Sequence, residues 1–217
     1  MALAIFDLDN TLLAGDSDHL WGEYLADQGI VDGEHYRREN DRFLRAYEDG
    51  SLDIHAFLRF SLQVLAAHAP ADLERWRAAF VEERILPRIA PGAPDLLARH
   101  RDAGDHLLII TATNRFVTEP IAHHLGVDDL IATEPHMEGE RYTGDVAGTP
   151  CFREGKIKRL DQWLVGAPHA LAGSHFYSDS HNDIPLLERV DRPVAVDPDA
   201  RLAAAARDRG WPVISLR

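Results

Sequence analysis

The first apolar run of the chain, Leu3–Leu8, ends in two aspartates, Asp7 and Asp9, which are separated by one residue. Such a run is typical of a buried parallel strand, and ligands bind at the carboxyl ends of parallel strands in open α/β sheets. A solvated turn that caps the next helix would explain the same residues. Two close carboxylates repel each other, so a site built on them is expected to contain a cation or a shared proton.

Two later apolar strands also end in polar residues. His106–Thr113 ends in hydroxyl side chains that include Thr111, and His175–Ser178 leads into Asp179 and Asp183, four residues apart. A hydroxyl at this place could merely end its strand or cap the next helix. Carboxylate oxygens suit Mg²⁺, which prefers a nearly octahedral shell of oxygen ligands.

Lysine is nearly absent from the chain, which otherwise uses arginine. The two lysines are Lys156 and Lys158. If Ile157, Leu160 and Leu164 form the buried stripe of a helix, Lys156 lies beside that stripe and Lys158 points away from it. A compact ammonium is therefore expected at Lys156, and Lys158 serves as its solvated counterpart. Two ordinary surface lysines are the simpler alternative.

The elements that must position these residues alternate between strand and helix. Strands are predicted at Leu3–Leu8, His106–Thr113, Leu130–Thr133, His175–Ser178, Pro193–Val196 and Pro212–Leu216. Helices are predicted at Ala93–Ala103, Phe116–Leu125, Lys156–Val165, Ile184–Arg189 and Ala200–Arg209. This order predicts an α/β fold with a doubly wound parallel sheet, and Arg141–Gly148 is predicted to form a small hairpin.

The stretch between the first two strands differs, because its periodicity is helical throughout. Helices are predicted at Asp18–Gln28, Glu34–Glu48, Asp53–His68 and Asp72–Ile85. Four helices without a strand between them favour a helical cap that is inserted after the first strand. The expected division is a catalytic core of residues 1–15 and 86–217 with a cap of residues 16–85.

The pattern Asp-x-Asp-x-Thr resembles the first motif of the haloacid dehalogenase-like phosphatases, and Asp7-Leu8-Asp9-Asn10-Thr11 matches it at every required position. Matches to the later motifs follow in order at Thr111, at Gly155-Lys156 and at Ser178–Asp183. The resemblance covers essentially the whole chain. It implies a Rossmann-like core with its cap after the first motif, as in phosphoserine phosphatase-like enzymes.

The resemblance also implies a catalytic role for four residues. Asp7 would be the nucleophile that forms an acyl phosphate, and Asp9 would be the general acid that later activates water. Thr111 would donate a hydrogen bond to a phosphoryl oxygen. Lys156 would offset the charge of the aspartate and the phosphate.

The cofactor implied by the resemblance is Mg²⁺. Asp7, the backbone carbonyl of Asp9, and Asp179 could supply its protein ligands, and Asp183 is expected to orient a metal-bound water or the lysine. His181 lies inside the same segment, but imidazole suits magnesium poorly, so His181 is interpreted as a loop residue.

The substrate is expected to be a small phosphate monoester, and the cap is expected to select it. The residues expected to contact it are Thr11, Asp16, Thr111, Ala112 and Lys156. In phosphoserine phosphatases an acidic residue nine positions after the nucleophile contacts the amino group of the substrate, and Asp16 occupies that position. Asp16 could equally cap the following helix.

Two features favour histidinol phosphate over phosphoserine. The second motif reads Thr-Ala-Thr, where phosphoserine phosphatases usually have Ser-Gly-Gly, and the added side chains restrict close backbone approach. The segment Gly15–Trp21 is more similar to a bacterial branch that includes histidinol-phosphate phosphatases. Histidinol phosphate is a cationic amino alcohol ester, which Asp16, Asp18 and other acidic residues of the cap could hold.

Two other functions remain compatible with these motifs. A phosphotransferase or mutase would pass the phosphoryl group to an alcohol, and a signalling module would retain phosphorylated Asp7 as a switch. A P-loop is excluded, because Ile157 follows Gly155-Lys156 and Pro150 occupies the first glycine position. A His-Glu-x-x-His zinc motif is missing from the sequence.

The composition restricts the partners and the compartment. The net charge of −13 opposes broad binding to nucleic acid or to anionic lipid. Cys151 is the single cysteine, so a disulfide framework is excluded. No apolar run is long enough to span a membrane, and the start MALAIFDLDN does not resemble a signal peptide, so a cytoplasmic location is expected. No sequence feature predicts the oligomeric state.

Overall fold

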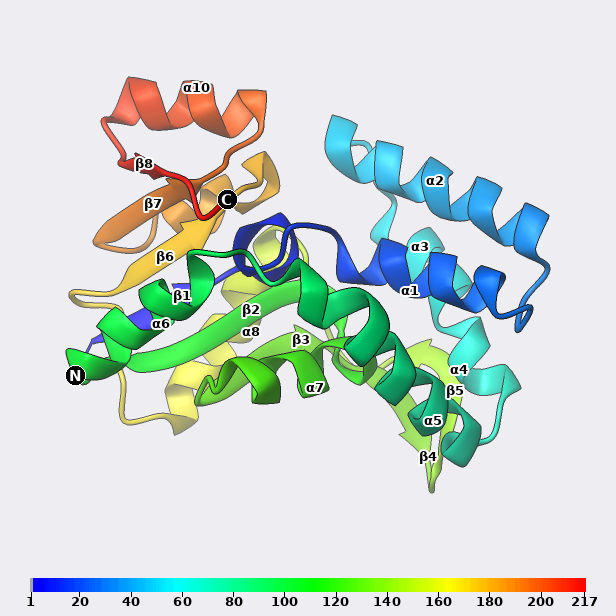
Figure 1. The fold of residues 1–217 in the computed structure, drawn as a ribbon. Coiled ribbons are helices and arrows are strands. Elements are labelled where there is room, and N and C mark those ends of the chain that lie inside the picture. The colour runs from blue at the N-terminus through cyan, green and yellow to red at the C-terminus, as the bar shows by residue number, and fades with distance from the viewer. Residues whose placement is uncertain (1) are drawn as a thin grey trace.

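The computed structural model describes residues 2–217 and is built around a six-stranded parallel sheet (Figure 1). In spatial order the strands are β3 (Asp129–Thr133), β2 (His106–Asn114), β1 (Leu3–Phe6), β6 (His175–Ser178), β7 (Arg192–Val196) and β8 (Val213–Ile214). Phe6 of β1 pairs with Ile109 of β2 on one side and with Tyr177 of β6 on the other. The predicted parallel sheet is confirmed, and the carboxyl ends of β1, β2 and β6 lie at one edge.

Helices cover both faces of this sheet, which confirms the doubly wound arrangement (Figure 1). They are α6 (Ala93–Asp102) and α7 (Arg115–Leu125) on one face, and α8 (Glu154–Gly166), α9 (Ile184–Leu187) and α10 (Ala200–Arg209) on the other. The alternation of β1 explains the two cores. Ala4 and Phe6 pack with the first group of helices, whereas Leu3 and Ile5 pack with the second.

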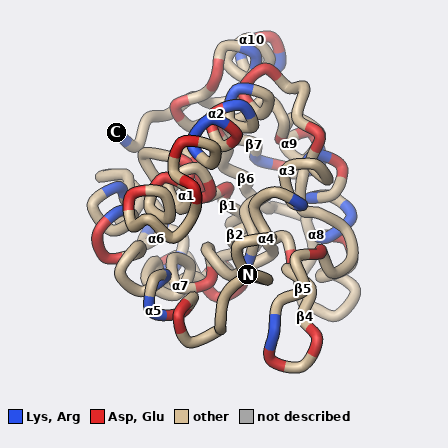
Figure 2. Tube along the Cα trace, turned by 90° about the vertical axis from the view of Figure 1, so that its right-hand side faces the viewer, with Lys and Arg blue, Asp and Glu red and all other residues tan. Residues whose placement is uncertain are grey.

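Residues 17–88 lie entirely within the described part of the chain and form helices and turns only. The helices are α1 (Ser17–Asp27), α2 (Gly33–Asp49), α3 (Ile54–Ser61), α4 (Gln63–Ala67) and α5 (Pro70–Phe80), followed by a π-helical turn at Val81–Ile85 and a 3₁₀ turn at Leu86–Arg88. Asp16, Asp32 and Asp53 cap α1, α2 and α3 by accepting hydrogen bonds from backbone N–H groups. Figure 2 shows basic and acidic residues alternating along α2.

The predicted single helix Asp53–His68 is wrong, because it is divided at Leu62 into α3 and α4. Leu62 still accepts hydrogen bonds from the backbone N–H groups of Leu65 and Ala66, so the chain turns without losing its bonds. Leu58, Leu62 and Leu65 are all buried. The break therefore interrupts the helix while one apolar face stays packed.

The predicted hairpin at Arg141–Gly148 is only half of the observed one. β4 (Pro135–Glu138) pairs in antiparallel fashion with β5 (Arg141–Val146). The hairpin packs against α4, and a Cβ atom at Gly144 would lie 3.4 Å from the Cβ of Ala66 and 2.8 Å from Nε2 of Gln63. Gly144, at φ 86°, permits this close approach.

The helical segment leaves and rejoins the sheet region at neighbouring points. After β1 the chain makes a tight turn at Leu8–Leu12 and then forms an isolated antiparallel bridge between Leu13 and Ile89. The N–H of Ala14 also donates to the carbonyl of Arg88 at 2.6 Å. The two linking segments therefore run side by side.

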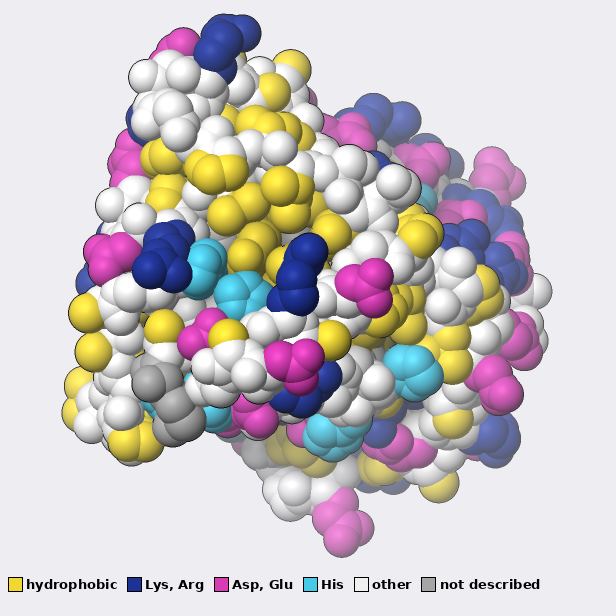
Figure 3. Space-filling model, turned by 60° about the vertical axis from the view of Figure 1, so that its left-hand side comes forward, with side chains coloured by type: hydrophobic (Ala, Val, Ile, Leu, Met, Phe, Trp, Pro, Cys, Tyr) yellow, Lys and Arg dark blue, Asp and Glu magenta, His cyan; other side chains and the backbone are white. Residues whose placement is uncertain are grey.

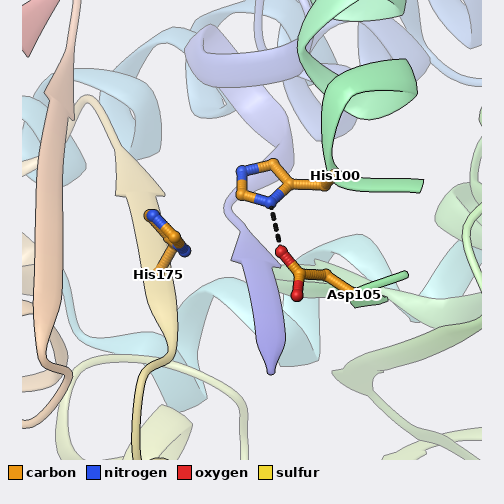
Figure 4. A group of neighbouring side chains, drawn as sticks. All are labelled: His100, Asp105 and His175. Carbon is orange, nitrogen blue, oxygen red and sulfur yellow. Dashed lines mark hydrogen bonds and ion pairs between the residues drawn. The ribbon is translucent and has the colours of Figure 1, made fainter. Parts of the chain in front are cut away.

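A histidine cluster lies at the opposite edge, where the strands begin (Figure 4). His100 places one ring nitrogen 2.8 Å from Asp105 Oδ2 and the other 2.9 Å from the hydroxyl of Tyr177, and its ring lies against that of His175. Hydrophobic side chains gather on this side of the molecule, next to arginine and histidine residues (Figure 3). Both nitrogens of His100 have partners, whereas Nδ1 of His175 is buried and has no hydrogen-bond partner among the described residues.

Among residues 2–217, no helix is both long enough and apolar enough to cross a membrane.

Candidate active site

Asp7 stands at the centre of the edge formed by β1, β2 and β6. Its backbone N–H donates to the carbonyl of Tyr177 at 2.9 Å, which continues the pairing of β1 with β6 for one more residue. The residue is 3% exposed. Burial raises the pKa of Asp7 to about 7, and the Lys156 ammonium opposes that rise. The strand order thus places one ionisable carboxylate between the ends of two neighbouring strands.

Lys156 reaches this carboxylate from the first turn of α8. Its Nζ donates to Oδ1 of Asp7 at 2.8 Å and to Oδ2 of Asp183 at 2.7 Å. Burial lowers the pKa of Lys156, but the charges of Asp183 and Asp7 prevail and hold it well above the usual value. Lys156 is buried, whereas Lys158 is exposed. The amphipathic reading of the helix therefore distinguished the two lysines.

Gly155 permits the position of Lys156. A Cβ atom at residue 155 would lie 2.0 Å from the backbone oxygen of Pro150, so only glycine fits without movement of the chain. Because the contact involves backbone, a flexible side chain cannot relieve it. The Gly-Lys pair is thus a steric requirement as well as a motif.

Asp9 lies outside the ion pair and is held by hydrogen bonds. Its Oδ1 accepts from the N–H of Ser17 at 2.7 Å, and its Oδ2 accepts from the hydroxyl of Thr113 at 2.8 Å. Burial and the negative charge of Asp16 raise the pKa of Asp9 to about 6, while the hydrogen bonds limit the rise. A carboxyl with this pKa can both donate and accept a proton near neutral pH.

Thr113 was not among the residues predicted for the site. The predicted Thr111 lies farther from Asp9, with 3.4 Å between Oγ1 and Oδ2, and its hydroxyl accepts from the N–H of Thr113 at 3.2 Å. The alternation of a strand places residues i and i+2 on one side. That periodicity, applied to the Thr-Ala-Thr sequence, would have identified Thr113.

The two aspartates after β6 have different partners. Asp179 accepts from the hydroxyl of Thr11 at 3.1 Å, and its own N–H donates to that hydroxyl. Asp183 accepts from Ser178 Oγ at 2.7 Å in addition to Lys156. Asp183 is therefore placed to orient the lysine, and Thr11 holds Asp179.

His181, interpreted above as a loop residue, points to a different partner. Both its N–H and its Nδ1 lie 2.7 Å from Oδ2 of Asp199, which also caps α10. This arrangement joins the loop after β6 to the start of α10.

The oxygen atoms at this edge could serve as ligands of a divalent cation. Burial and the charges of Asp7 and Asp183 raise the pKa of Asp179 well above its usual value, so the three carboxylates repel one another. Lys156 is the single cation that the described ion pairs place on Asp7 and Asp183. A group of ligand atoms that are all oxygen and that carry excess negative charge matches the ligands that Mg²⁺ prefers.

A cavity opens in front of these carboxylates and reaches the helical segment. Its catalytic-edge lining consists of Asp7, Asp9, Thr111, Ala112 and Thr113, and its remaining lining consists of Asp16, Asp18, His19, Asn40, Phe43, Leu44, Tyr47, Leu52, Ile54 and Phe57. Among the residues expected to contact substrate, Asp16, Thr111 and Ala112 line the cavity. Thr11 and Lys156 are set behind it, where they hold Asp179 and Asp7.

The two acidic residues at the start of α1 differ in their bonding. Oδ1 of Asp16 accepts from the N–H of His19 at 2.8 Å and so caps the helix. Oδ2 of Asp18 is buried and has no hydrogen-bond partner among the described residues. Burial raises the pKa of both residues, and the charges of Asp16 and Asp9 add to the rise at Asp18.

The end of α2 is tied to the catalytic edge. Arg153 donates to the carbonyl of Gly50 and, at 2.9 Å, to Oδ1 of Asn182. Asn182 in turn donates to the carbonyl of Tyr47 at 3.3 Å. Arg153 has a positive φ of 51°, which side-chain-bearing residues rarely adopt. These bonds join the end of α2 to the start of α8 and to the loop after β6.

Comparison with known proteins identifies relatives over the whole chain. The pattern of the haloacid dehalogenase-like hydrolases matches residues 4–188. A histidinol-phosphatase of Neisseria meningitidis is 45% identical, over 99% of both chains. The phosphoserine phosphatase SerB1 of Mycobacterium tuberculosis is 31% identical, over 100% of this chain and 71% of its own. A solved protein of unknown function from Bordetella pertussis Tohama I aligns with a TM-score of 0.93 and 47% identity, over 100% of this chain and 99% of its own.

Proposed function

Since the chain belongs to the haloacid dehalogenase-like hydrolases and is a phosphatase, we propose that it hydrolyses a small phosphate monoester. In this proposal the reaction passes through an aspartyl-phosphate intermediate, and Mg²⁺ is the cofactor. The observation that carries the proposal is the buried contact of Lys156 with Asp7 at the edge where Asp9 and Asp179 also lie. This arrangement combines a nucleophile, a second carboxyl and a fixed cation.

In the first step, an oxygen of Asp7 attacks phosphorus and the bond between phosphorus and the ester oxygen breaks. Protonated Asp9 gives its proton to that oxygen, so the product leaves as a neutral alcohol. The N–H of Ser17 and the hydroxyl of Thr113 fix the Asp9 carboxyl during this transfer. The acyl phosphate remains on Asp7.

In the second step, Asp9 acts as the base. Its carboxylate removes a proton from a water molecule as the water oxygen attacks phosphorus. The bond between phosphorus and Asp7 breaks, which releases inorganic phosphate and restores the Asp7 carboxylate. Asp9 retains the proton for the next turnover. Lys156 balances negative charge on Asp7 throughout, and Asp183 keeps the ammonium in place.

The residues that would hold the metal are Asp7, the backbone carbonyl of Asp9, and Asp179. When bound, Mg²⁺ would stabilise the charge on the phosphoryl oxygens. Thr11 would support this set by fixing Asp179. We propose that Asp183 stays outside the ligand set, because its Oδ2 already accepts from Lys156 and Ser178.

The substrate in this proposal is an amino alcohol phosphate, with histidinol phosphate favoured over phosphoserine. A relative named histidinol-phosphatase shares 45% identity over nearly the full length of both chains, whereas the phosphoserine phosphatase relative shares 31%. The side chains of Thr111, Ala112 and Thr113 occupy the cavity wall where the sequence departs from Ser-Gly-Gly.

We also propose that the chain is divided into a core of residues 1–15 and 86–217 and a cap of residues 16–85. We further propose a cytoplasmic location.

The proposal is tested by phosphate release from a panel of esters. The panel contains histidinol phosphate, phosphoserine, sugar phosphates, nucleotides and an aryl phosphate, each with Mg²⁺ and with chelator. Wild type is compared with Asp7→Asn and with Asp208→Asn, a control at a side chain that is 71% exposed. We expect magnesium-dependent turnover that Asp7→Asn abolishes and Asp208→Asn retains. Phosphate release only with an alcohol acceptor would indicate a phosphotransferase, and a long-lived phospho-form without release would indicate a switch.

A further inference from the structure

The cavity has an apolar wall that faces the catalytic edge. Phe43, Leu44 and Tyr47 of α2 meet Ile54 and Phe57 of α3 there. The rings of Phe43 and Phe57 pack edge to face with centroids 5.4 Å apart. A wall of this kind suits the carbon skeleton of the leaving alcohol, because it removes apolar surface from water.

Asp18 is the one acidic side chain in the lining of this cavity with an oxygen that is both buried and without a partner among the described residues. The residue is 8% exposed, lines the cavity, and leaves Oδ2 without a hydrogen bond. Its neighbour Asp16 is already used as the cap of α1. A buried carboxylate without a partner is costly, so a cation in the cavity would gain a strong charge-assisted contact with Asp18.

The lining of the cavity also lacks a side chain with a permanent positive charge. Among the described residues that line it, none is lysine or arginine, and His19 is the one histidine. Asp9, Asp16 and Asp18 would repel a carboxylate on the substrate at close range. Phosphoserine carries such a carboxylate, whereas an amino alcohol phosphate does not.

We infer that Asp18 binds the cationic group of the leaving alcohol, and that the site selects phosphate monoesters whose alcohol part is cationic and free of carboxylate. The kinetic test of this inference depends on the proposed phosphatase activity, whereas the binding test does not. The inference assigns to Asp18 the contact that the motif comparison would give to Asp16, because Oδ1 of Asp16 already accepts from the backbone of α1. The apolar wall then receives the remainder of the alcohol.

The kinetic test compares esters that differ in one group. Phosphoethanolamine equals phosphoserine without the carboxylate, so kcat/KM for the first is expected to exceed that for the second by about tenfold or more. In Asp18→Asn, the ratio of kcat/KM for histidinol phosphate to that for an uncharged aryl phosphate is expected to fall by about 10- to 100-fold, the loss typical of a hydrogen bond to a charged group. Asp72→Asn removes the same charge from a side chain that is 43% exposed outside the cavity, and should leave the ratio as in wild type.

A binding test works without turnover. Histidinol carries a hydroxymethyl group where histidine carries a carboxylate. Calorimetry with wild type should therefore show that histidinol binds about tenfold or more tightly than histidine. Asp18→Asn, checked for folding by its melting temperature, should bind histidinol about tenfold or more weakly than wild type, because the charged contact is lost. Equal binding of the two compounds by wild type, or an unchanged affinity for histidinol in folded Asp18→Asn, would overturn the inference. If wild type turns over no ester at all, the proposed function fails while the binding test still judges Asp18.

Discussion

Nζ of Lys156 lies 2.8 Å from Oδ1 of Asp7, although the two residues are 149 positions apart in the chain. The same ammonium reaches Asp183 at 2.7 Å, and all three side chains are buried. Removal of one partner from such a group leaves uncompensated charge in the interior, which costs more than the loss of an exposed ion pair.

We therefore expect Lys156→Met to lower both stability and activity. The free energy of unfolding should fall by about 3–5 kcal/mol, because Asp7 and Asp183 lose their shared cation. Turnover should fall by about 100-fold or more, because the charge on the nucleophile is no longer offset. Chemical denaturation and phosphate release measure the two effects. Lys158→Met alters an exposed side chain and should change neither; equal losses in both variants would contradict the assignment.

Magnesium should stabilise the protein through Asp179. A ligand that binds only the folded state adds RT ln(1 + [L]/Kd), about 2.7 kcal/mol at 100 times Kd. We expect the melting temperature of wild type to rise with Mg²⁺ and to return with chelator. Asp179→Asn should lose this rise, and, since it removes one of three repelling carboxylates, it should be no less stable than wild type in chelator. A retained magnesium shift in Asp179→Asn would remove Asp179 from the metal site.

Gly155→Ala should act on Lys156 through the backbone. The new Cβ would lie 2.0 Å from the oxygen of Pro150, so the start of α8 must move. We expect the free energy of unfolding to fall by about 1–3 kcal/mol, as for other overpacked sites, with a loss of kcat. Gly166, at the other end of α8, has open space around its Cβ position, so Gly166→Ala is the matched control. Measurement of denaturation midpoints and kcat for both variants would show whether the effect is specific.

Acid should destabilise the protein partly through His175. Burial, with a contribution from the neighbouring His100 ring, lowers the pKa of His175 below its ordinary value of 6.5 (Figure 4). The unfolded chain therefore binds the proton more readily, and stability is lost as the pH falls through about 6.5 toward the lower folded pKa. His175→Gln should flatten this loss when unfolding is measured between pH 7.5 and 5.5 by denaturant. His124→Gln, at an exposed position, should retain the wild-type slope.

Arg153 should hold the end of α2, which carries the cavity residue Tyr47, in place. Arg153→Ala removes the hydrogen bonds to Gly50 and Asn182, so KM should rise several-fold and amide exchange at residues 47–53 should become faster. Hydrogen-exchange mass spectrometry measures the second effect directly. Arg45→Ala, at an exposed position of α2, is the control. Unchanged exchange at residues 47–53 would show that other contacts suffice.

The sequence predicted the sheet well because its strands are short apolar runs bounded by charged residues or glycine. The kink at Leu62 could not be predicted, because the apolar period continues through it and the hairpin that packs on α4 lies far along the chain. β4 was missed since Pro135–Glu138 has no apolar run and is half exposed. Local periodicity thus gives elements, while their breaks depend on distant partners.

The site shows the same distinction. Motif spacing identified Asp7 and Lys156 because Asp7 follows directly after β1 and Lys156 lies in the first turn of α8. The order of strands and helices fixes the place of both elements in the fold. The bond between Thr113 and Asp9 depends on the exact turn at Asp9 and Asn10, where Asn10 takes a φ of 55°. The unpartnered oxygen of Asp18 likewise emerges only when the neighbours of α1 are known.

Because Leu13 and Ile89 form a bridge, the two ends of the helical segment lie next to each other, and the segment joins the sheet region at one place. Insertions or deletions between those ends can occur without displacing Asp7 or the strand order. Evolution can therefore exchange the walls that recognise the alcohol while it preserves the phosphorus chemistry. A laboratory graft that replaces residues 18–88 and keeps Ser17, whose N–H holds Asp9, is expected to retain the catalytic edge and to change which esters are hydrolysed.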